Sequence, residues 1–483
     1  MKGKVTLIGA GIGRGELMTL RGYKILKNAD VVVYDRLLGE GVMDMIPEKA
    51  EKINAGKKSS NHLIPQEEIN EILVSKALEG KNVVRLKGGD SYLFGRGGEE
   101  IEALIAHNID FEVVPGITSS IAAPAFAGIP VTHRNCASSV HIITGHNRKG
   151  KELNINYKAC VEIGGTLIFL MGVKNMVVIA EGLINAGMPA DMPCAVIENG
   201  GSSKQKKVIS TISKVSEEAK DLKSPSVIVV GEVCRYSGKL DWFSNLPLKG
   251  KNIIVTRPKE MATGLVDELR ALGASVVIVP SIITEPIISD INKIIELIKE
   301  HSFIAFTSAV GVRTVFDKLF ESGFDARIFG NSSIAAIGKR TGEELLKYGI
   351  KADIIPEKHY TSDLANALVN EKAENVLILR TENGSEELTD ILKNNNVKYE
   401  DIGVYKTLPY INEKTELPET VDYVVFASAS EVRNFVGNKL NYIGVCIGEK
   451  TAEEAKKYGI SCIVAKKQSN EGIAECIIKD VIK

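Results

Sequence analysis

Short apolar runs alternate with longer amphipathic stretches along most of the chain. The short runs are rich in Val and Ile and have the length of buried strands, whereas the longer stretches repeat apolar residues at helical spacing. We expect strands at 5–8, 31–34, 83–86, 111–114, 166–171, 194–198 and 227–230, and helices at 17–28, 67–78, 99–107 and 176–186. This alternation predicts an α/β fold with mainly parallel strands.

A polar segment at 244–251, Ser-Asn-Leu-Pro-Leu-Lys-Gly-Lys, interrupts the alternation. Because polar and turn-forming residues of this kind mark domain boundaries, we expect a linker that joins a domain at 1–243 to a domain at 252–483. The first domain is expected to form two lobes, at about 1–132 and 133–243.

A weak internal repeat runs through the second domain. Three short segments recur in the same order, at 253–257 and 376–380, at 306–309 and 426–429, and at 337–345 and 447–455. Such a repeat predicts two similar α/β lobes. The cleft between two lobes is then the expected binding site.

Charge and cysteine content exclude several classes of protein. The 60 Lys and Arg residues almost balance 61 Asp and Glu, so we expect no nucleic-acid partner. The seven cysteines include no Cys-x-x-Cys pair, and we expect no metal. No apolar run reaches the ~18 residues that span a bilayer, and the first residues lack a signal-length apolar core. We therefore expect a cytoplasmic protein with no membrane partner.

A glycine-rich loop follows the first expected strand. Gly9-Ala-Gly11-Ile-Gly13 leads into a helix, an arrangement that turns backbone N–H groups toward a polar or anionic cofactor. Asp35 closes the second strand and is placed to bind a ribose diol, which raises the alternative of a dinucleotide-binding oxidoreductase. Arg14 stands at the third fingerprint position, where close packing of helix on strand needs a small residue.

Two further strand ends carry glycine or small polar residues. The strand at 83–86 runs into Gly88-Gly89-Asp90, and the strand at 111–114 runs into a segment that contains Thr118 and Ser119. Three strand ends therefore point to one pocket. The sequence argues against a P-loop nucleoside triphosphatase, because the segment that begins at Gly338 lacks the preceding glycine of that motif.

The first half resembles the uroporphyrinogen-III C-methyltransferase family in a series of ordered motifs across 1–243. They are Val-Tyr34-Asp35-Arg36, Leu-Lys87-Gly-Gly-Asp90, Phe-Gly-Arg96-Gly-Gly-Glu-Glu, Pro-Gly-Ile-Thr118-Ser119, Thr-His133-Arg134, Thr144-Gly-His146 and Leu-Met171-Gly. The resemblance implies a two-lobed α/β fold, usually a homodimer, with S-adenosylmethionine as methyl donor. It implies two methylations of uroporphyrinogen III that give precorrin-2 by way of precorrin-1, toward sirohaem or cobalamin.

The same resemblance implies a set of cofactor-binding residues. They are Ile12, Gly88, Gly89, Asp90, Leu93, Thr118, Ser119, Met171 and Gly200. Family members usually have Pro at the position of Ile12 and Asp at that of Arg14. The resemblance also proposes Asp35 as proton acceptor and Lys57 as proton donor, for which a ribose clamp and a carboxylate ligand are the alternatives.

The proposed substrate carries eight carboxylates, so its pocket must be basic. The candidates in the first half are Arg36, Arg85, Lys87, Arg96, His133, Arg134 and His146. The alternative is that two or three of these side chains form internal salt bridges instead.

The second half resembles uroporphyrinogen-III synthase over about 250–483. The motifs are Ile-Val-Thr-Arg257-Pro, Phe-Thr307-Ser308, Ile-Gly-x-x-Thr341, Leu-Arg380, Val-Tyr405, Phe-Ala-Ser428 and Ile-Gly-x-x-Thr451. The resemblance implies cofactor-free cyclisation of hydroxymethylbilane with inversion of its last ring, Tyr405 being the candidate proton donor to the leaving hydroxide. The five Thr and Ser residues would bind substrate carboxylates or cap helices. Arg257 and Arg380 would bind carboxylates or lock the lobes together.

The sequence therefore predicts a bifunctional enzyme of tetrapyrrole synthesis, whose second half makes the substrate of its first half. One alternative is a methyltransferase whose second half only binds a tetrapyrrole. The other is an NAD-linked oxidoreductase, for which the loop at 9–13 and Asp35 are the only support.

Overall fold

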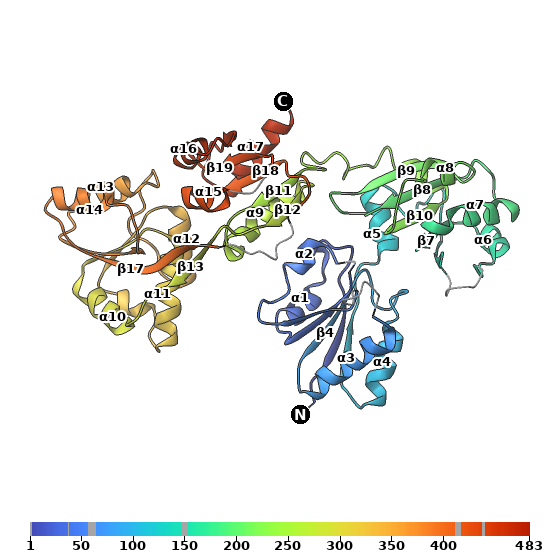
Figure 1. Cartoon of the computed structure of the whole chain (residues 1–483), viewed down its shortest axis with the longest axis horizontal. Helices are drawn as coiled ribbons and strands as arrows, with labels where there is room; N and C mark the ends of the chain where they lie inside the picture. The colour runs from blue at the N-terminus through green and yellow to red at the C-terminus, as the bar shows by residue number, and fades with distance from the viewer. Residues whose placement is uncertain (1, 37, 57–63, 147–152, 411–416, 437–439) are drawn as a thin grey trace.

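The computed structural model describes residues 2–36, 38–56, 64–146, 153–410, 417–436 and 440–483. Within these residues the chain forms four five-stranded sheets, each flanked by helices. Two sheets belong to the first half, coloured blue to green, and two to the second half (Figure 1). None of the described helices is both long and apolar enough to cross a membrane.

The first sheet is entirely parallel, in the order β3-β2-β4-β1-β5. Its strands are β1 (Val5–Gly9), β2 (Val31–Tyr34), β3 (Glu51–Asn54), β4 (Val83–Lys87) and β5 (Phe111–Val114), and its helices are α1 (Leu20–Leu26), α2 (Glu40–Met43), α3 (Gln66–Leu78) and α4 (Gly97–Ala106). Buried apolar residues cover both faces. All five strands therefore end at one edge, where the glycine-rich loops meet.

The first helix begins later than its pattern predicts. Gly15–Leu17 forms a short 3₁₀ turn, and α1 starts at Leu20. Thr19 caps it, because its hydroxyl accepts a hydrogen bond from the backbone N–H of Gly22 at 3.2 Å. A residue that satisfies an otherwise unpaired N–H at a helix start fixes where the helix begins.

The second sheet is mostly antiparallel and differs from the expected pattern. Its order is β6-β7-β10-β8-β9, and only the pair β6–β7 is parallel. Its strands are β6 (Val140–Thr144), β7 (Thr166–Leu170), β8 (Pro193–Glu198), β9 (Lys206–Thr211) and β10 (Ser226–Val230), with helices α5 (Ser119–Phe126), α6 (Tyr157–Ile163), α7 (Met176–Asn185) and α8 (Val215–Glu218). The short 199–205 connection cannot contain a crossover helix, so β8 and β9 must run antiparallel.

The third sheet takes strands from both ends of the second half. Its parallel strands, in the order β12-β11-β18-β19-β20, are β11 (Asn252–Val255), β12 (Ser275–Ile278), β18 (Tyr423–Phe426), β19 (Ile443–Cys446) and β20 (Cys462–Val464). Helices α9 (Lys259–Ala271), α15 (Ala429–Phe435), α16 (Glu449–Lys457) and α17 (Asn470–Val481) accompany them. Figure 1 shows this mixture of yellow-green and red segments in one lobe.

The fourth sheet is formed by the intervening residues, in the order β13-β17-β16-β14-β15. Its strands are β13 (Ile282–Pro286), β14 (Phe303–Phe306), β15 (Ser333–Ala336), β16 (Asn375–Thr381) and β17 (Lys398–Pro409), with helices α10 (Ile291–Glu300), α11 (Ala309–Glu321), α12 (Lys339–Lys347), α13 (Thr361–Asn370) and α14 (Glu387–Asn394). The repeated segments fall on equivalent strands, since β11-β18-β19 corresponds to β16-β14-β15. The lobe of the fourth sheet is therefore inserted, in the sequence, between the two parts of the lobe that contains the third sheet.

Candidate active sites

Three strand ends of the first sheet touch through glycine backbone. Gly11 and Gly89 exchange two hydrogen bonds, with N–O distances of 3.1 and 2.6 Å. A Cβ on Gly9 would lie 2.5 Å from the backbone N of Gly116 and 2.7 Å from the backbone O of Gly89. Glycine is therefore required at this edge for the loops after β1, β4 and β5 to approach one another.

Asp90 joins two of these loops through its side chain. Its Oδ1 accepts hydrogen bonds from the N–H groups of Tyr92 and Leu93, at 2.8 and 3.2 Å. Its Oδ2 accepts one from the N–H of Gly116, at 3.0 Å. Asp90 therefore fixes the shape of the glycine-rich edge.

The N-terminus of α5 faces the same edge. The hydroxyl of Thr118 caps this helix by accepting a bond from the N–H of Ser120. A Cβ on Gly89 would lie 3.7 Å from the backbone N of Ser119 and 3.8 Å from the Cα of Thr118. The predicted cofactor residues of the β4 and β5 loops are thus neighbours.

The second lobe of the first half packs against α5 and against the glycine loop after β1. A Cβ on Gly200 would clash with the Cβ of Ala123 in α5, and one on Gly201 would clash with Ile12 Cδ1. Met171, directly after β7, is half exposed. The open glycine backbone, the α5 N-terminus and an exposed thioether fit a cofactor such as S-adenosylmethionine, which needs close backbone contact.

A buried charge cluster lies beneath this edge. Glu100 is fully buried, and its Oε1 lies 3.0 Å from Arg85 Nε and 2.7 Å from Lys87 Nζ. Arg85 also pairs through Nη2 with Asp35 Oδ1 at 2.6 Å. Burial, followed by the charge of Arg85, lowers the pKa of Lys87.

This cluster corrects two predictions from the sequence. Arg85 and Lys87 are almost fully buried and already paired, so they are not available to substrate carboxylates. Glu100 was missed, although a signal for it exists. Two basic residues two positions apart on a buried strand point the same way and need a buried counterion.

Asp35 lies at the end of β2, with its side chain 33% exposed and oriented by Arg85. This placement is compatible with either predicted role, as proton acceptor or as polar ligand. Lys57, the predicted proton donor, lies outside the described residues.

The other basic candidates of the first half divide into two groups. Arg96 pairs with Glu99, the Nε–Oε1 distance being 2.9 Å, and His133 stacks on Tyr236 with ring centroids 4.3 Å apart. The remaining candidates are exposed and are Arg36, Arg134 and His146. These three are the better placed to meet a substrate.

In the second half, Tyr405 of β17 lies beside the N-terminus of α11. Its hydroxyl is 3.0 Å from the hydroxyl of Ser308, which accepts a hydrogen bond from the N–H of Gly311 and so caps α11. Burial raises the pKa of Tyr405, although its hydrogen bond with Ser308 opposes this. The phenol is therefore held protonated and oriented.

The hydroxyl residues of the repeat differ in accessibility. Ser428 caps α15 by accepting a hydrogen bond from the N–H of Glu431, as Ser308 does in the other lobe, and Thr307 is half-buried beside Ser308. Thr341 and Thr451 lie in the first turns of α12 and α16, where both are buried. The hydroxyls of Thr341 and Thr451 are therefore less accessible than those of Ser308 and Ser428, and carboxylate binding by either residue, through the hydroxyl or an adjacent backbone N–H, stays a prediction.

Basic residues at helix starts of one lobe of the second half lie near residues of the other lobe. Lys450, in the first turn of α16, lies 5.2 Å from the ring centroid of Tyr360, at the start of α13 in the other lobe. Lys339, in the first turn of α12, lies near Glu471 of α17 in the opposite lobe. A hydrogen bond from Ser469 and the charge of Lys339, among other causes, lower the pKa of the Glu471 carboxyl.

Arg340 extends this pattern. Burial first, and then the positive charge of Arg340 from the opposite lobe, lower the pKa of Arg257 to about 10. Sequence reasoning missed Lys339, Arg340 and Lys450, because they occupy the undefined positions of the Ile-Gly-x-x-Thr motif. Cations at helix starts of each lobe therefore lie near the opposite lobe, an arrangement that suits a substrate with many carboxylates.

The two arginines of the repeat have different surroundings. Arg380 forms two bonds to Asp401, at 2.8 and 2.6 Å, so its predicted role as a carboxylate ligand is corrected to one inside its own lobe. Arg257 donates to Asn470 at 2.9 Å, and its Nε and Nη2 have no partner among the described residues. Strand pairing places Ile278 where the other lobe has Asp401.

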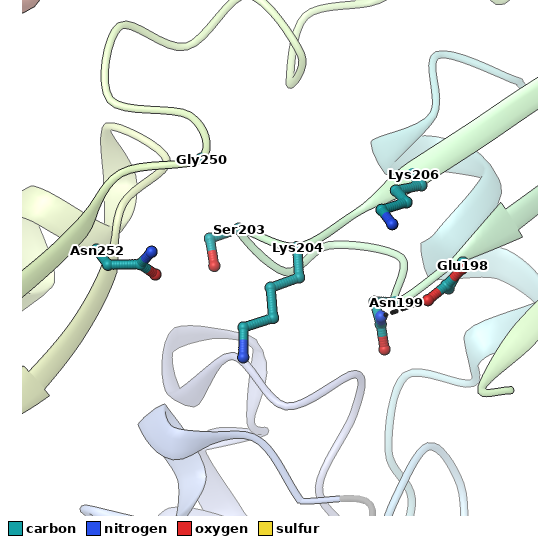
Figure 2. Close-up of a pocket in the computed structure, with 7 residues that line it drawn as sticks. All are labelled: Glu198, Asn199, Ser203, Lys204, Lys206, Gly250 and Asn252. Carbon is teal, nitrogen blue, oxygen red and sulfur yellow. Dashed lines mark hydrogen bonds between the residues drawn. The ribbon is translucent and has the colours of Figure 1, made fainter. Parts of the chain in front are cut away.

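A pocket of about 330 Å³ lies at the junction of the two halves (Figure 2). Its lining residues are Glu198, Asn199, Ser203, Lys204, Lys206, Gly250 and Asn252. None of these is a candidate from the sequence, and the lining shares no residue with the glycine-rich edge or with the cations between the lobes of the second half.

Two family models match the chain. Residues 4–216 match the model of tetrapyrrole (corrin/porphyrin) methylases, and residues 264–475 match that of uroporphyrinogen-III synthase HemD. The two matches divide the chain on either side of the polar segment.

Curated relatives agree with this division. The porphyrin biosynthesis protein HemD of Ruminiclostridium josui is 43% identical over 99% of this chain and 98% of that protein. An S-adenosyl-L-methionine-dependent uroporphyrinogen III methyltransferase of Methanosarcina barkeri is 50% identical over 48% of this chain and 92% of its own length. A siroheme synthase of Escherichia coli is 46% identical over 50% of this chain and 53% of its own length.

Proposed function

Because the chain belongs to the family of the Ruminiclostridium josui porphyrin biosynthesis protein HemD, we propose that it is a bifunctional enzyme of tetrapyrrole synthesis. Its second half cyclises hydroxymethylbilane to uroporphyrinogen III. Its first half methylates that product twice and gives precorrin-2 by way of precorrin-1. The observation that carries the proposal is that one chain combines a glycine-rich strand edge with cations at helix starts that lie near the opposite lobe.

For methylation, bound S-adenosylmethionine supplies an electrophilic methyl group. The strand-end glycines let backbone groups approach the cofactor, and Asp90 and Thr118 hold those loops in place. Asp35, oriented by Arg85, accepts a proton from the substrate once methyl transfer has made it cationic. Lys57 remains the proposed proton donor, and the exposed Arg36, Arg134 and His146 are proposed to bind carboxylates.

For cyclisation, the cleft holds the bilane by its carboxylates. Lys339, Arg340 and Lys450 supply positive charge from helix starts on both sides. The protonated Tyr405 hydroxyl donates to the leaving hydroxide, and Ser308 fixes its direction. Closing the correct ring depends mainly on how the cleft folds the substrate.

The decisive experiment is anaerobic incubation of the whole protein with hydroxymethylbilane and S-adenosylmethionine, followed by absorbance and mass. Two added methyl groups on a type III macrocycle support both activities. If methylation occurs only when uroporphyrinogen III is supplied, the second half is a tetrapyrrole-binding module instead. Failure to methylate uroporphyrinogen III contradicts the first activity.

The family membership argues against the NAD-linked oxidoreductase, whose support was one glycine loop with Asp35. We also propose a homodimer that forms through the first half and acts in the cytoplasm, with sirohaem or cobalamin as end product. Light scattering of the whole protein tests the dimer.

A further inference from the structure

The two halves meet in a small cluster, which we call the junction clasp and define as Arg14, Asp44, Phe243, Lys249 and Arg270. Arg14 follows the glycine loop of β1, and Asp44 follows α2. Arg270 lies in α9 of the second half, which faces α2 at the junction (Figure 1). Phe243 precedes the polar segment between the halves, and Lys249 lies within it.

Arg14 reaches three separate parts of the molecule. Its Nη2 donates to the backbone O of Arg270 at 3.2 Å, and its Nη1 donates to the backbone O of Gly201 at 3.3 Å. Its guanidinium also lies over the rings of Phe126 and Phe243, 5.4 and 5.6 Å from their centroids. One side chain therefore links the glycine loop to the second lobe and to the second half.

Arg270 holds the support of that loop. Its Nη2 donates to Asp44 Oδ2 and to the backbone O of Val276, both at 2.8 Å. The segment before Asp44 packs directly on the glycine loop, since a Cβ on Gly13 would lie 2.8 Å from the backbone N of Gly39. The second half thus contacts both the loop and the segment beneath it.

Lys249 binds the connection between β8 and β9. Its Nζ donates to the backbone O atoms of Ser202 and Ser203, at 2.9 and 2.5 Å, and lies 4.8 Å from the Phe243 ring centroid. These two serines belong to the 199–205 connection, which closes on Ile12. Lys249 therefore holds the connection that packs on Ile12. Arg14 and Asp44 join the glycine loop and the segment beneath it to α9.

We propose that Arg14 is a positioning residue through which the synthase half holds the cofactor loop of the methyltransferase half. Affinity for S-adenosylmethionine then depends on contacts from α9 that act through Arg14 and Asp44. This proposal rests on the proposed function, in which Ile12 and its loop contact S-adenosylmethionine.

The test uses Arg14→Gln in the full-length protein, with S-adenosylhomocysteine as the calorimetric probe. We expect its dissociation constant and the KM for S-adenosylmethionine to rise about tenfold, as for loss of a charge-assisted hydrogen bond. The kcat of methylation and the rate of cyclisation should not change. Arg14→Lys, which keeps the charge but not the planar fork, should recover part of the affinity.

Asp44→Asn tests the contribution of the second half, because it breaks the ion pair with Arg270 and leaves Arg14 in place. We expect the dissociation constant of S-adenosylhomocysteine and the KM for S-adenosylmethionine to rise about threefold. Arg235→Gln is the matched control, since Arg235 forms an exposed ion pair with Glu232 in the first half, to which Arg14 and Asp44 also belong. It should bind S-adenosylhomocysteine as the unchanged protein does.

Two results would overturn the proposal. One is an Arg14→Gln affinity equal to that of Arg235→Gln. The other is an unchanged affinity in Asp44→Asn, which would show that the second half does not act on the loop. If Arg14→Gln does not fold, Asp44→Asn alone decides. A complete lack of S-adenosylhomocysteine binding by the unchanged protein contradicts the proposed function itself.

Discussion

Basic residues on a strand of the first half and basic residues at a helix start of the second half have opposite surroundings. In the first half, Arg85 and Lys87 lie within a strand and are neutralised by the buried Glu100. In the second half, Lys339 and Arg340 start a helix and are exposed toward the opposite lobe. A cation inside a buried strand needs a buried counterion, whereas an exposed one in the first turn of a helix remains accessible to a ligand.

The largest expected effect breaks the buried pairing. Glu100→Gln leaves Arg85 and Lys87 without their common counterion, and we expect it to destabilise the first half by about 3 kcal/mol. Urea unfolding, followed by fluorescence and by methylation activity, measures this loss. The neighbour substitution Glu99→Gln is the control, since its pair with Arg96 is exposed and worth less than about 1 kcal/mol. Equal effects of the two changes would contradict a structural role for Glu100.

The second prediction separates structure from chemistry in the first half. We expect Asp35→Ala to lower the rate of methylation by about 100-fold or more, because the proposed proton acceptor is lost. Cyclisation by the second half should not change. Assays with uroporphyrinogen III and with hydroxymethylbilane measure the two activities separately. A loss of both activities would show that the two sites are not independent.

The third prediction concerns the exposed cations at the start of α12 in the second half. The double change Lys339→Gln with Arg340→Gln should raise the KM for hydroxymethylbilane about tenfold and weaken its dependence on salt, because two carboxylate contacts are lost. Methylation of supplied uroporphyrinogen III should not change. Arg327→Gln, which breaks an exposed pair with Asp325 in the same lobe, is the control. An unchanged KM in the double variant would contradict a carboxylate-binding cleft.

The smallest expected effect is at Tyr405. We expect Tyr405→Phe to slow cyclisation about threefold to tenfold, since the folding of the bilane supplies most of the catalysis. Because burial raises the pKa of Tyr405, its hydroxyl keeps its proton to a higher pH than an exposed tyrosine does. The difference between the unchanged protein and Tyr405→Phe should therefore persist at pH 10. Its disappearance between pH 9 and 10 would contradict this environment.

Much of the fold was predictable, since its elements are set by local patterns. The strands β2 and β5 match the apolar runs at 31–34 and 111–114. The internal repeat correctly indicated two similar lobes in the second half. The antiparallel second sheet was not predicted, because strand direction depends on pairings between segments that are distant in the sequence.

The candidate sites were predictable to a smaller extent. Glycines at strand ends are visible in the sequence, and the structure brings Gly9, Gly89 and Gly116 together as expected. The partners of the charged residues were not visible, because whether a basic side chain is paired depends on what packs against it. The roles of Asp35, Lys57 and Tyr405 stay predictions.

The sequence alone determined the α/β alternation and the glycine-rich strand ends, because apolar spacing and the absence of a Cβ act over a few residues. Tertiary structure decided that one synthase lobe is inserted into the other, and that Arg380 is paired with Asp401 while its counterpart Arg257 is not. It also placed Arg14 against Arg270. These outcomes depend on contacts between segments far apart in the chain, which only the packed structure brings together.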